Sequence, residues 1–235
     1  MESTERTVVA HEPRWHASLA VLAALALYIT LPPRLTIGPV WLAPLAVMIF
    51  LVPLSVLAPK RHRETRRMRF FGILLIAIVN FFNIASVLLL VDGFFHPQRT
   101  AELNSAAALL RHGLQIWFTN ILVFALWFWE LDGDGPDVRT HASTAVEFKN
   151  ADFLFPQMQM VVASGGDVSA SQCVDPNWKP QFFDYVYLAF TNSTAFSPTD
   201  VMPLSVWAKA LMMVEALISL ITIAIVLARS VSLIQ

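Results

Sequence analysis

The stretch YLAFTNSTAFSPTDVMP, residues 187–203, separates a short apolar segment from the last long apolar run of the chain. The segment before its polar part, residues 182–190, is aromatic and aliphatic. It is too short to cross a bilayer as a helix, which takes about 20 apolar residues. Non-helical backbone at membrane depth survives only where protein or a water-filled cavity satisfies its polar groups. A short apolar helix, a polar turn and a full span in succession therefore indicate a re-entrant segment.

The composition of the chain indicates a membrane protein. Hydrophobic residues make up 56% of the chain and charged residues only 14%, whereas a typical soluble domain has about 25% charged residues. The formal net charge of −1 gives no reason to expect a nucleic-acid partner, and the single cysteine, Cys173, cannot form an intrachain disulfide. We expect an all-α polytopic membrane protein whose partner is the lipid bilayer and which has no cofactor.

Five apolar stretches meet or approach the length of a transmembrane helix, which is about 17–25 residues. They cover residues 17–31, 40–57, 70–91, 114–129 and 204–228. The first is short and competes with a cleaved signal peptide, but its leader carries Glu2, Glu5 and Glu12 and is not the basic region of a signal peptide. Residues 101–111 extend the fourth stretch backwards, as an interfacial or a continuous helix. We expect about five spans, plus the re-entrant helix before the last one.

Positive charge is concentrated in one connection of the chain. Residues 60–69, between the second and third spans, hold six Lys and Arg residues, and no other short loop has more than two. Because cytoplasmic loops carry an excess of Lys and Arg, we expect loop 60–69 and the N-terminus in the cytoplasm of a cell-membrane protein. Five spans then place the C-terminus outside, and the long loop 131–181 in the cytoplasm.

Polar side chains inside the spans are candidates for a functional site, because a charged group in a bilayer is costly and faces a bundle interior or a wet cavity. Glu215 lies in the last span, near mid-membrane, and needs a partner or water. Asn80 and Asn83 share one face of the third span, and Asn120 lies in the fourth. The asparagines fit hydrogen bonding between helices or the lining of a pore.

The segment ELDGDGPD, residues 130–137, looks superficially like a calcium loop. An EF-hand loop needs a Glu at its twelfth position, and counting from Asp132 that position is Ser143. We therefore expect a solvated turn that caps span four. The histidines show no metal-ligand spacing, and no motif for nucleotide binding or hydrolysis is present, so we expect neither a metal site nor an enzyme.

The stretch after residue 190 resembles the pore module of the potassium-channel superfamily, in which a short pore helix ends in T-x-x-T-V-G-Y-G-D-x-x-P-V-T-x-x-G-[KR] before an inner helix. The matching positions here are Thr191, Thr194, Asp200, Pro203 and Lys209, with one extra residue between Thr194 and Asp200. The resemblance covers about residues 182–230 and implies that span four is the outer helix. The chain as a whole also resembles uncharacterised bacterial five-span membrane proteins.

The resemblance implies a set of filter-like positions, which here lack the glycines of a potassium filter. These positions are Thr191, Ser193, Thr194, Ala195, Phe196, Ser197, Pro198, Thr199 and Asp200. Potassium filters hold the ion with successive backbone carbonyls, a geometry that depends on glycine at positive φ, whereas proline fixes φ near about −65°. We expect hydroxyl groups in place of the carbonyl ladder, and little discrimination among monovalent cations. Ser219 stands about where the family often places a hinge glycine.

The resemblance also divides the chain into two regions. Residues 1–113 form an N-terminal three-span membrane region that contains the basic loop 60–69, and residues 114–235 form a channel-like module. The module comprises span four, the polar loop 131–181, the re-entrant helix 182–191, the filter-like turn 192–203 and the last span 204–230.

The leading hypothesis is a homo-oligomeric ion-conducting pore, a tetramer if the module is channel-like, because one re-entrant loop per chain cannot enclose an axis by itself. The alternative is a non-conducting membrane sensor or structural protein, in which the short helix is a packing element or lies flat at the interface. A small-solute transporter is a third hypothesis, although the inverted repeats that are usual for transporters are not visible.

Overall fold

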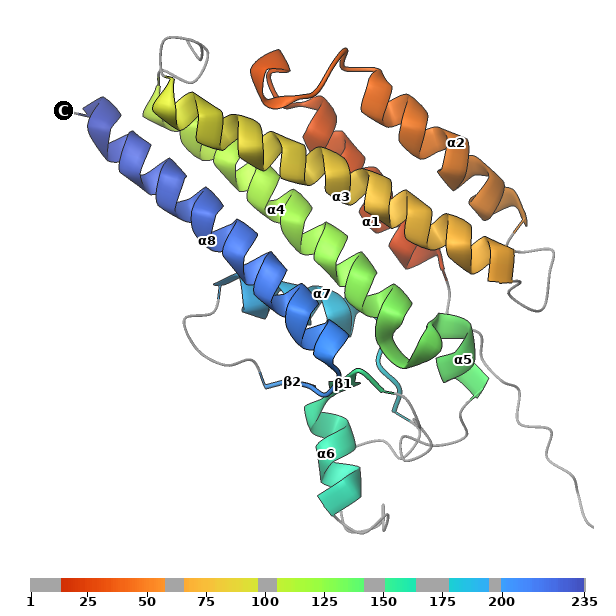
Figure 1. Cartoon of the computed structure of the whole chain (residues 1–235). Helices are drawn as coiled ribbons and strands as arrows, with labels where there is room; N and C mark the ends of the chain where they lie inside the picture. Colours follow the sequence, from red (N-terminus) through yellow and green to blue (C-terminus); the bar gives the residue numbers. More distant parts are fainter. Residues whose placement is uncertain are drawn as a thin grey trace, which may run out of the picture.

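The computed structural model describes residues 14–57, 66–96, 105–141, 151–163, 178–194 and 200–234. Its long elements are the helices α1 (Trp15–Ile29), α2 (Leu42–Leu57), α3 (Arg66–Phe95), α4 (Ala106–Leu131) and α8 (Val206–Ile234). Figure 1 shows these helices side by side, with successive helices running in opposite directions. The prediction of an all-α fold is confirmed, and α4 is one continuous helix that runs through residues 113 and 114.

The shorter elements gather at the end of the bundle where α4 ends and α8 begins, here called the loop end (Figure 1). They are η5 (Asp132–Asp134), α5 (Pro136–His141), β1 (Phe153–Leu154), α6 (Pro156–Ala163), α7 (Phe182–Thr194) and β2 (Met202–Pro203). Strands β1 and β2 pair antiparallel, with Phe153 opposite Pro203, and the Leu204 N–H donates to the Asp152 carbonyl at 2.8 Å. The turn η1 (Pro33–Leu35) joins α1 to α2 at the opposite end.

Three of the described helices, α3, α4 and α8, are long and apolar enough to cross a membrane. Helices α1 and α2 contain 15 and 16 residues. At about 1.5 Å per residue they are about 22 and 24 Å long, less than the roughly 30 Å of a bilayer core. The protein is therefore consistent with a membrane protein that has three long spans, and the two further spans stay a prediction.

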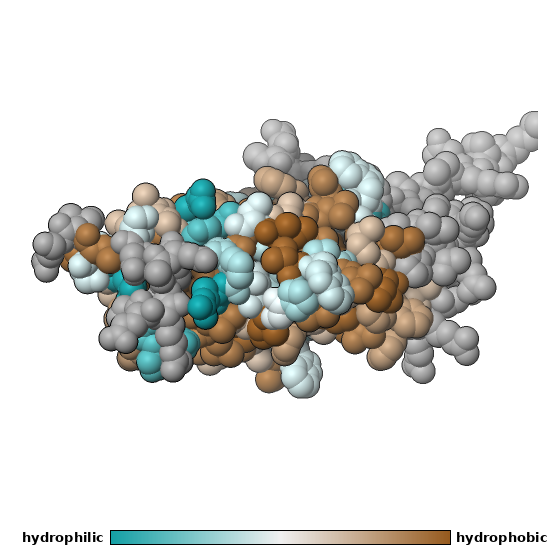
Figure 2. All heavy atoms as spheres, turned by 90° about the horizontal axis from the view of Figure 1, so that it is seen from above, coloured by the Kyte–Doolittle hydropathy of each residue, from teal (hydrophilic) through white to brown (hydrophobic). Residues whose placement is uncertain are grey.

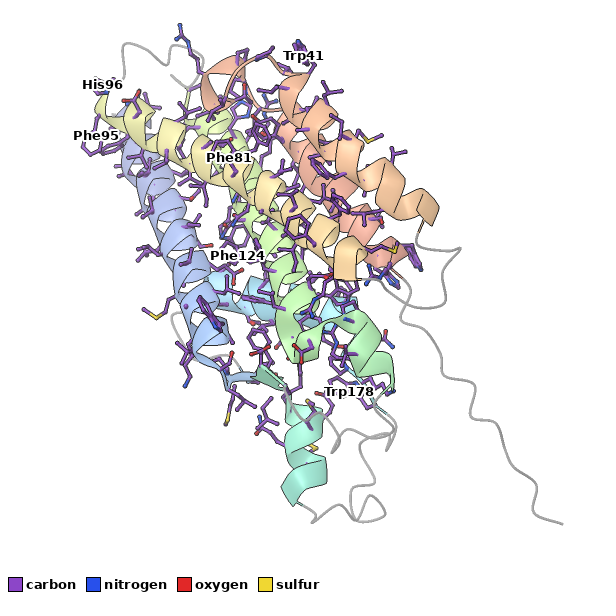
Figure 3. The ribbon with its side chains drawn as sticks, turned by 45° about the vertical axis from the view of Figure 1, so that its right-hand side comes forward. Trp41, Phe81, Phe95, His96, Phe124 and Trp178 are labelled. Carbon is purple, nitrogen blue, oxygen red and sulfur yellow. The ribbon has the colours of Figure 1, made fainter. Side chains whose placement is uncertain are left out.

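Helix α4 lies at the centre of the bundle, because it packs against α1, α3, α7 and α8. Its N-cap, Ser105, accepts a hydrogen bond from the Ala108 N–H at 3.1 Å, which satisfies one of the amides that have no partner within the helix. Phe124 and Phe128 are fully buried, and Figure 3 shows Phe124 in the middle of the molecule. The burial of α4 on several sides fixes the geometry of any site inside the bundle.

The outer surface of the bundle is mainly apolar. Figure 2, which views one face, shows brown apolar residues over much of the described surface and hydrophilic residues gathered toward the left. The face of α8 that points out of the bundle carries large apolar side chains such as Trp207, Met213, Leu217 and Leu220. In water such a surface would aggregate, whereas in a bilayer it meets lipid tails or a neighbouring chain.

Helices α4 and α8 approach each other closely at Gly113. A Cβ placed on Gly113 would lie 2.3 Å from Val226 Cγ2 and 3.4 Å from Val226 Cβ. Small residues allow this kind of approach between membrane helices. The absence of a side chain at Gly113 therefore sets the spacing of the two helices.

We expect Gly113→Ala to lower the thermal stability of the protein in detergent, with a free-energy cost of about 1–3 kcal/mol typical of overpacking. The double variant Gly113→Ala/Val226→Ala should recover part of the loss, because the clashing methyl groups are removed. Gly72→Ala is the matched control, since its Cβ would meet nothing nearer than Glu130 Oε1 at 3.9 Å. An unchanged unfolding temperature for Gly113→Ala would contradict the close helix contact.

Candidate functional site

A chain of hydrogen-bonded polar side chains crosses the bundle from α3 to α8. The Asn83 Nδ2 donates to Asn120 Oδ1 at 3.1 Å. The Asn120 Nδ2 donates to Ser219 Oγ at 3.1 Å and lies 3.4 Å from the Glu215 carbonyl oxygen. The side chains of all four residues of this chain are buried: Asn83, Asn120, Ser219 and Glu215. The structure thus brings together four of the polar residues that the sequence analysis singled out within the spans.

Glu215 connects this polar chain to the short helix α7. Its carboxyl group is fully buried, and each of its oxygens accepts one hydrogen bond from the last turn of α7. The Asn192 Nδ2 donates to Oε2 at 2.7 Å, and the Ser193 Oγ donates to Oε1 at 2.9 Å. Asn192 also donates to the Met212 carbonyl at 2.9 Å. The C-terminal end of α7 is therefore held against α8 by one acidic side chain.

Helix α7 packs into the bundle through one apolar face. Tyr185, Leu188 and Ala189 are fully buried, and α7 packs against α4 and α8. Helix α7 runs three residues further than the predicted 182–191 and ends at Thr194. Because Asn192 and Ser193 belong to this last turn, their side chains have fixed positions.

The other predicted site residues do not join the polar chain. Thr191 and Thr194 donate their hydroxyl groups to carbonyls of their own helix. Asn80 is half-buried, and its Oδ1 has no hydrogen-bond partner among the described residues. Asp200 is exposed, and its carbonyl lies 3.5 Å from Gln159 Nε2. The filter-like positions Ala195, Phe196, Ser197, Pro198 and Thr199 lie outside the described residues.

A second polar cluster, around Asp132, anchors the other end of α7. Asp132 Oδ2 accepts from the Tyr185 hydroxyl at 2.6 Å. Asp132 Oδ1 accepts from the Asp152 N–H at 2.7 Å and from the Phe153 N–H at 3.3 Å. The Arg139 guanidinium donates to the Asp132 carbonyl and lies 5.1 Å from the centre of the Tyr185 ring. One acidic residue thus joins the end of α4, α5, β1 and α7.

This cluster corrects the expectation of a solvated turn at residues 130–137. Glu130 and Asp132 are buried, with exposed fractions of 2% and 1%, while Asp134 is exposed. Gly133, Asp134 and Gly135 all have positive φ, a conformation that glycine adopts without strain. The resulting reversal turns the chain back, so that Arg139 meets Asp132. In the sequence, the Gly-Asp-Gly segment indicated only a turn. The burial of Asp132 could not be predicted, because its hydrogen-bond donors lie 20 to 53 residues away along the chain.

Comparisons of the chain with protein-family models, curated proteins and solved structures found no match. The functional argument therefore rests on the geometry of the buried polar groups. Within the described ranges, no group of three His, Cys, Asp or Glu side chains is placed to hold a metal ion. What the described geometry can do is bind a proton or a cation at Glu215 and position α7.

We expect Tyr185→Phe to destabilise the protein by about 1–3 kcal/mol, because Asp132 loses a buried hydrogen bond. Tyr187→Phe is the matched control on the same helix, since Tyr187 is exposed and surface changes stay within about 0.5 kcal/mol. Thermal or denaturant unfolding in detergent measures both. An equal effect of the two variants would mean that the hydroxyl of Tyr185 does not anchor α7.

Proposed function

We propose that the protein is a multi-pass membrane protein whose C-terminal part forms an oligomeric, channel-like pore that is poorly selective among monovalent cations. The proposal takes α1 and α2 as two further spans beside α3, α4 and α8. Adjacent apolar residues beyond each helix, such as Leu31, Val40 and Trp41, lengthen the apolar path of these short helices. Successive antiparallel helices (Figure 1) are the arrangement that repeated membrane crossing requires.

The observation that carries this proposal is the contact between the last turn of α7 and Glu215. Tyr185, in the first turn of α7, is bonded to Asp132 at the loop end. Ser193, in the last turn, is bonded to Glu215, which is nine residues into α8, or about 14 Å along its axis. Helix α7 thus runs inward to about half the roughly 30 Å core of a bilayer, which supports a re-entrant segment.

The return of the chain to the loop end supports the same proposal. After α7 ends at Thr194, β2 at Met202–Pro203 is again paired with β1 at the loop end. The described ends of this stretch, α7 and β2, therefore fit a segment that enters and leaves on one side, with a buried acid at the inner end of α7. Conduction would require several chains around an axis, and the apolar outer face of α8 is a surface on which they could meet.

A second candidate, a non-conducting membrane protein that uses α7 as a packing element, is favoured by one specific observation. The polar end of α7 is already hydrogen-bonded within its own chain, through Asn192 and Ser193. Thr191 and Thr194 also direct their hydroxyl hydrogen bonds to their own helix. In this alternative the polar groups stabilise the bundle and meet no permeating ion.

Flux of sodium and potassium into liposomes that contain the purified protein separates the two candidates. We expect both ions to pass at similar rates, because a segment without glycine carbonyls holds a dehydrated ion loosely. Glu215→Leu should reduce the flux, whereas the matched control Met213→Leu, on the exposed face of the same helix, should not. Strong potassium preference would contradict the proposed selectivity. A monomer in lipid with no flux under any gradient would establish the packing role instead.

The orientation of the protein is part of the proposal. Loop 60–69 holds six Lys and Arg residues, and the end of α2 and the start of α3, which it connects, lie at the loop end (Figure 1). Arg34 and Arg99 are the only Lys or Arg residues in the connections 30–41 and 96–105, which join the helix ends at the opposite end. By the excess of Lys and Arg in cytoplasmic loops, the loop end faces the cytoplasm and α7 enters from that side.

Cysteine labelling in intact cells tests this orientation, after Cys173→Ser removes the native thiol. A membrane-impermeant maleimide should label Gln98→Cys from outside, because residue 98 belongs to a connection at the opposite end. It should label Glu64→Cys only after the membrane is made permeable. Labelling of Glu64→Cys in intact cells would reverse the proposed orientation.

A further inference from the structure

Among the described residues, the buried carboxyl group of Glu215 has hydrogen-bond partners but no counter-charge. Its contacts from α7 are the amide of Asn192 and the hydroxyl of Ser193. From α4, Asn120 faces its backbone carbonyl. Neither of two ion pairs among the described residues, Arg69 with Glu130 and His96 with Asp92, includes it. The groups that the structure places in contact with Glu215 are therefore neutral.

The charged and titratable side chains on the helices packed around Glu215 are all distant from it along those helices. Those described on α3, α4, α7 and α8 are Arg69, Asp92, Arg111, His112, Glu130, Asp184, Tyr185, Tyr187, Lys209 and Arg229. On α3 and α4 each is at least eight residues from Asn83 or Asn120, which is about 12 Å or more along the axis. On α7 the nearest is the exposed Tyr187, and on α8 it is the exposed Lys209. None of them is hydrogen-bonded or ion-paired to Glu215.

The end of α7 also disfavours a negative charge at this position. The C-terminal end of a helix carries a partial negative charge from its unsatisfied carbonyl groups. Glu215 meets the last turn of α7, at Asn192 and Ser193. An ionised carboxylate would therefore face a like charge in an apolar, buried place, and two neutral donors offset only part of that cost.

A neutral carboxylic acid fits the same geometry without rearrangement. One carboxyl oxygen can accept from the Asn192 amide at 2.7 Å. The other can carry the proton and donate it to Ser193 Oγ at 2.9 Å, because a serine hydroxyl is both a donor and an acceptor. Each carboxyl oxygen then keeps one hydrogen bond and no charge is buried.

We propose that Glu215 is a proton-binding site, and that its bound proton holds the last turn of α7 against α8. When the proton is lost, the carboxylate becomes stable only if water reaches it, which requires this turn to move away. In the docked state the last turn of α7 lies against α8 and Glu215 binds the proton; in the undocked state this turn has moved away and Glu215 releases the proton. The docked state is therefore stable at low pH and becomes less stable as the pH rises. This inference goes beyond ion conduction and holds for either proposed function.

Infrared spectroscopy of the whole protein in lipid vesicles tests the protonation directly. We expect a carboxylic acid C=O band at neutral pH that shifts in D2O and is missing from Glu215→Gln. Asp200→Asn is the matched control, because Asp200 is an exposed acid at the loop end, and this variant should keep the band. The pH titration of the wild-type band needs no variant and should show its loss at alkaline pH.

Hydrogen exchange of peptides from α7 tests the link to its position. The wild type should exchange faster than Glu215→Gln at the same pH, by up to about tenfold for each pH unit between the titration of a water-exposed carboxyl group and that of Glu215 itself, and the difference should level off above the latter. Glutamine keeps the contact, because its amide can accept from Asn192 and donate to Ser193 without charge.

Three results would overturn the inference. Glu215→Gln could leave every carboxylic acid band in place, or its α7 peptides could respond to pH as the wild type does. A band that appears only when sodium and potassium are replaced by a large organic cation would also overturn it, in favour of a metal cation bound to an ionised Glu215. None of these measurements requires ion flux, so failure of conduction and failure of this inference are separate outcomes.

Discussion

Burial of an acidic side chain inside an apolar helix is the constraint on which the arrangement of α7 and α8 depends. A carboxyl group that is removed from water needs hydrogen-bond partners, and the apolar surroundings of Glu215 on α8 offer few. The short helix α7 provides two, from Asn192 and Ser193, at 2.7 and 2.9 Å. The Glu215 side chain thereby determines how deep α7 reaches and which of its turns touches α8.

A second buried acid holds the other end of the same helix. Asp132 accepts from Tyr185 in the first turn of α7 and from two backbone amides around β1. The two acids therefore hold α7 near both of its ends. They differ in their surroundings, because Arg139 lies beside Asp132, whereas the described polar groups in contact with Glu215 are amides and a hydroxyl. A change in protonation at Glu215 would act on the inner end of α7 and leave the outer end anchored.

The polar chain through Asn83, Asn120 and Ser219 extends this arrangement to α3 and α4. Hydrogen bonds between membrane helices contribute modestly to stability, about 0.6 kcal/mol on average, so their main effect is to select one register of the helices. The close contact of Gly113 with Val226, nearer the N-terminal end of α4 and the C-terminal end of α8, also favours one register of these helices. Together these contacts make the surroundings of Glu215 a defined site.

The sequence by itself determined the class of the protein and most of its helices, because long apolar runs and their breaks are local properties. Predicted spans 40–57, 70–91 and 204–228 agree with α2, α3 and α8 within a few residues at most ends. It also singled out Glu215, Asn83, Asn120 and Ser219, because polar residues in apolar runs stand out. Only the tertiary structure decided their partners, since Asn120 and Ser219 are 99 positions apart. It alone showed that Asp132 is buried, because the donors that allow this burial come from distant segments.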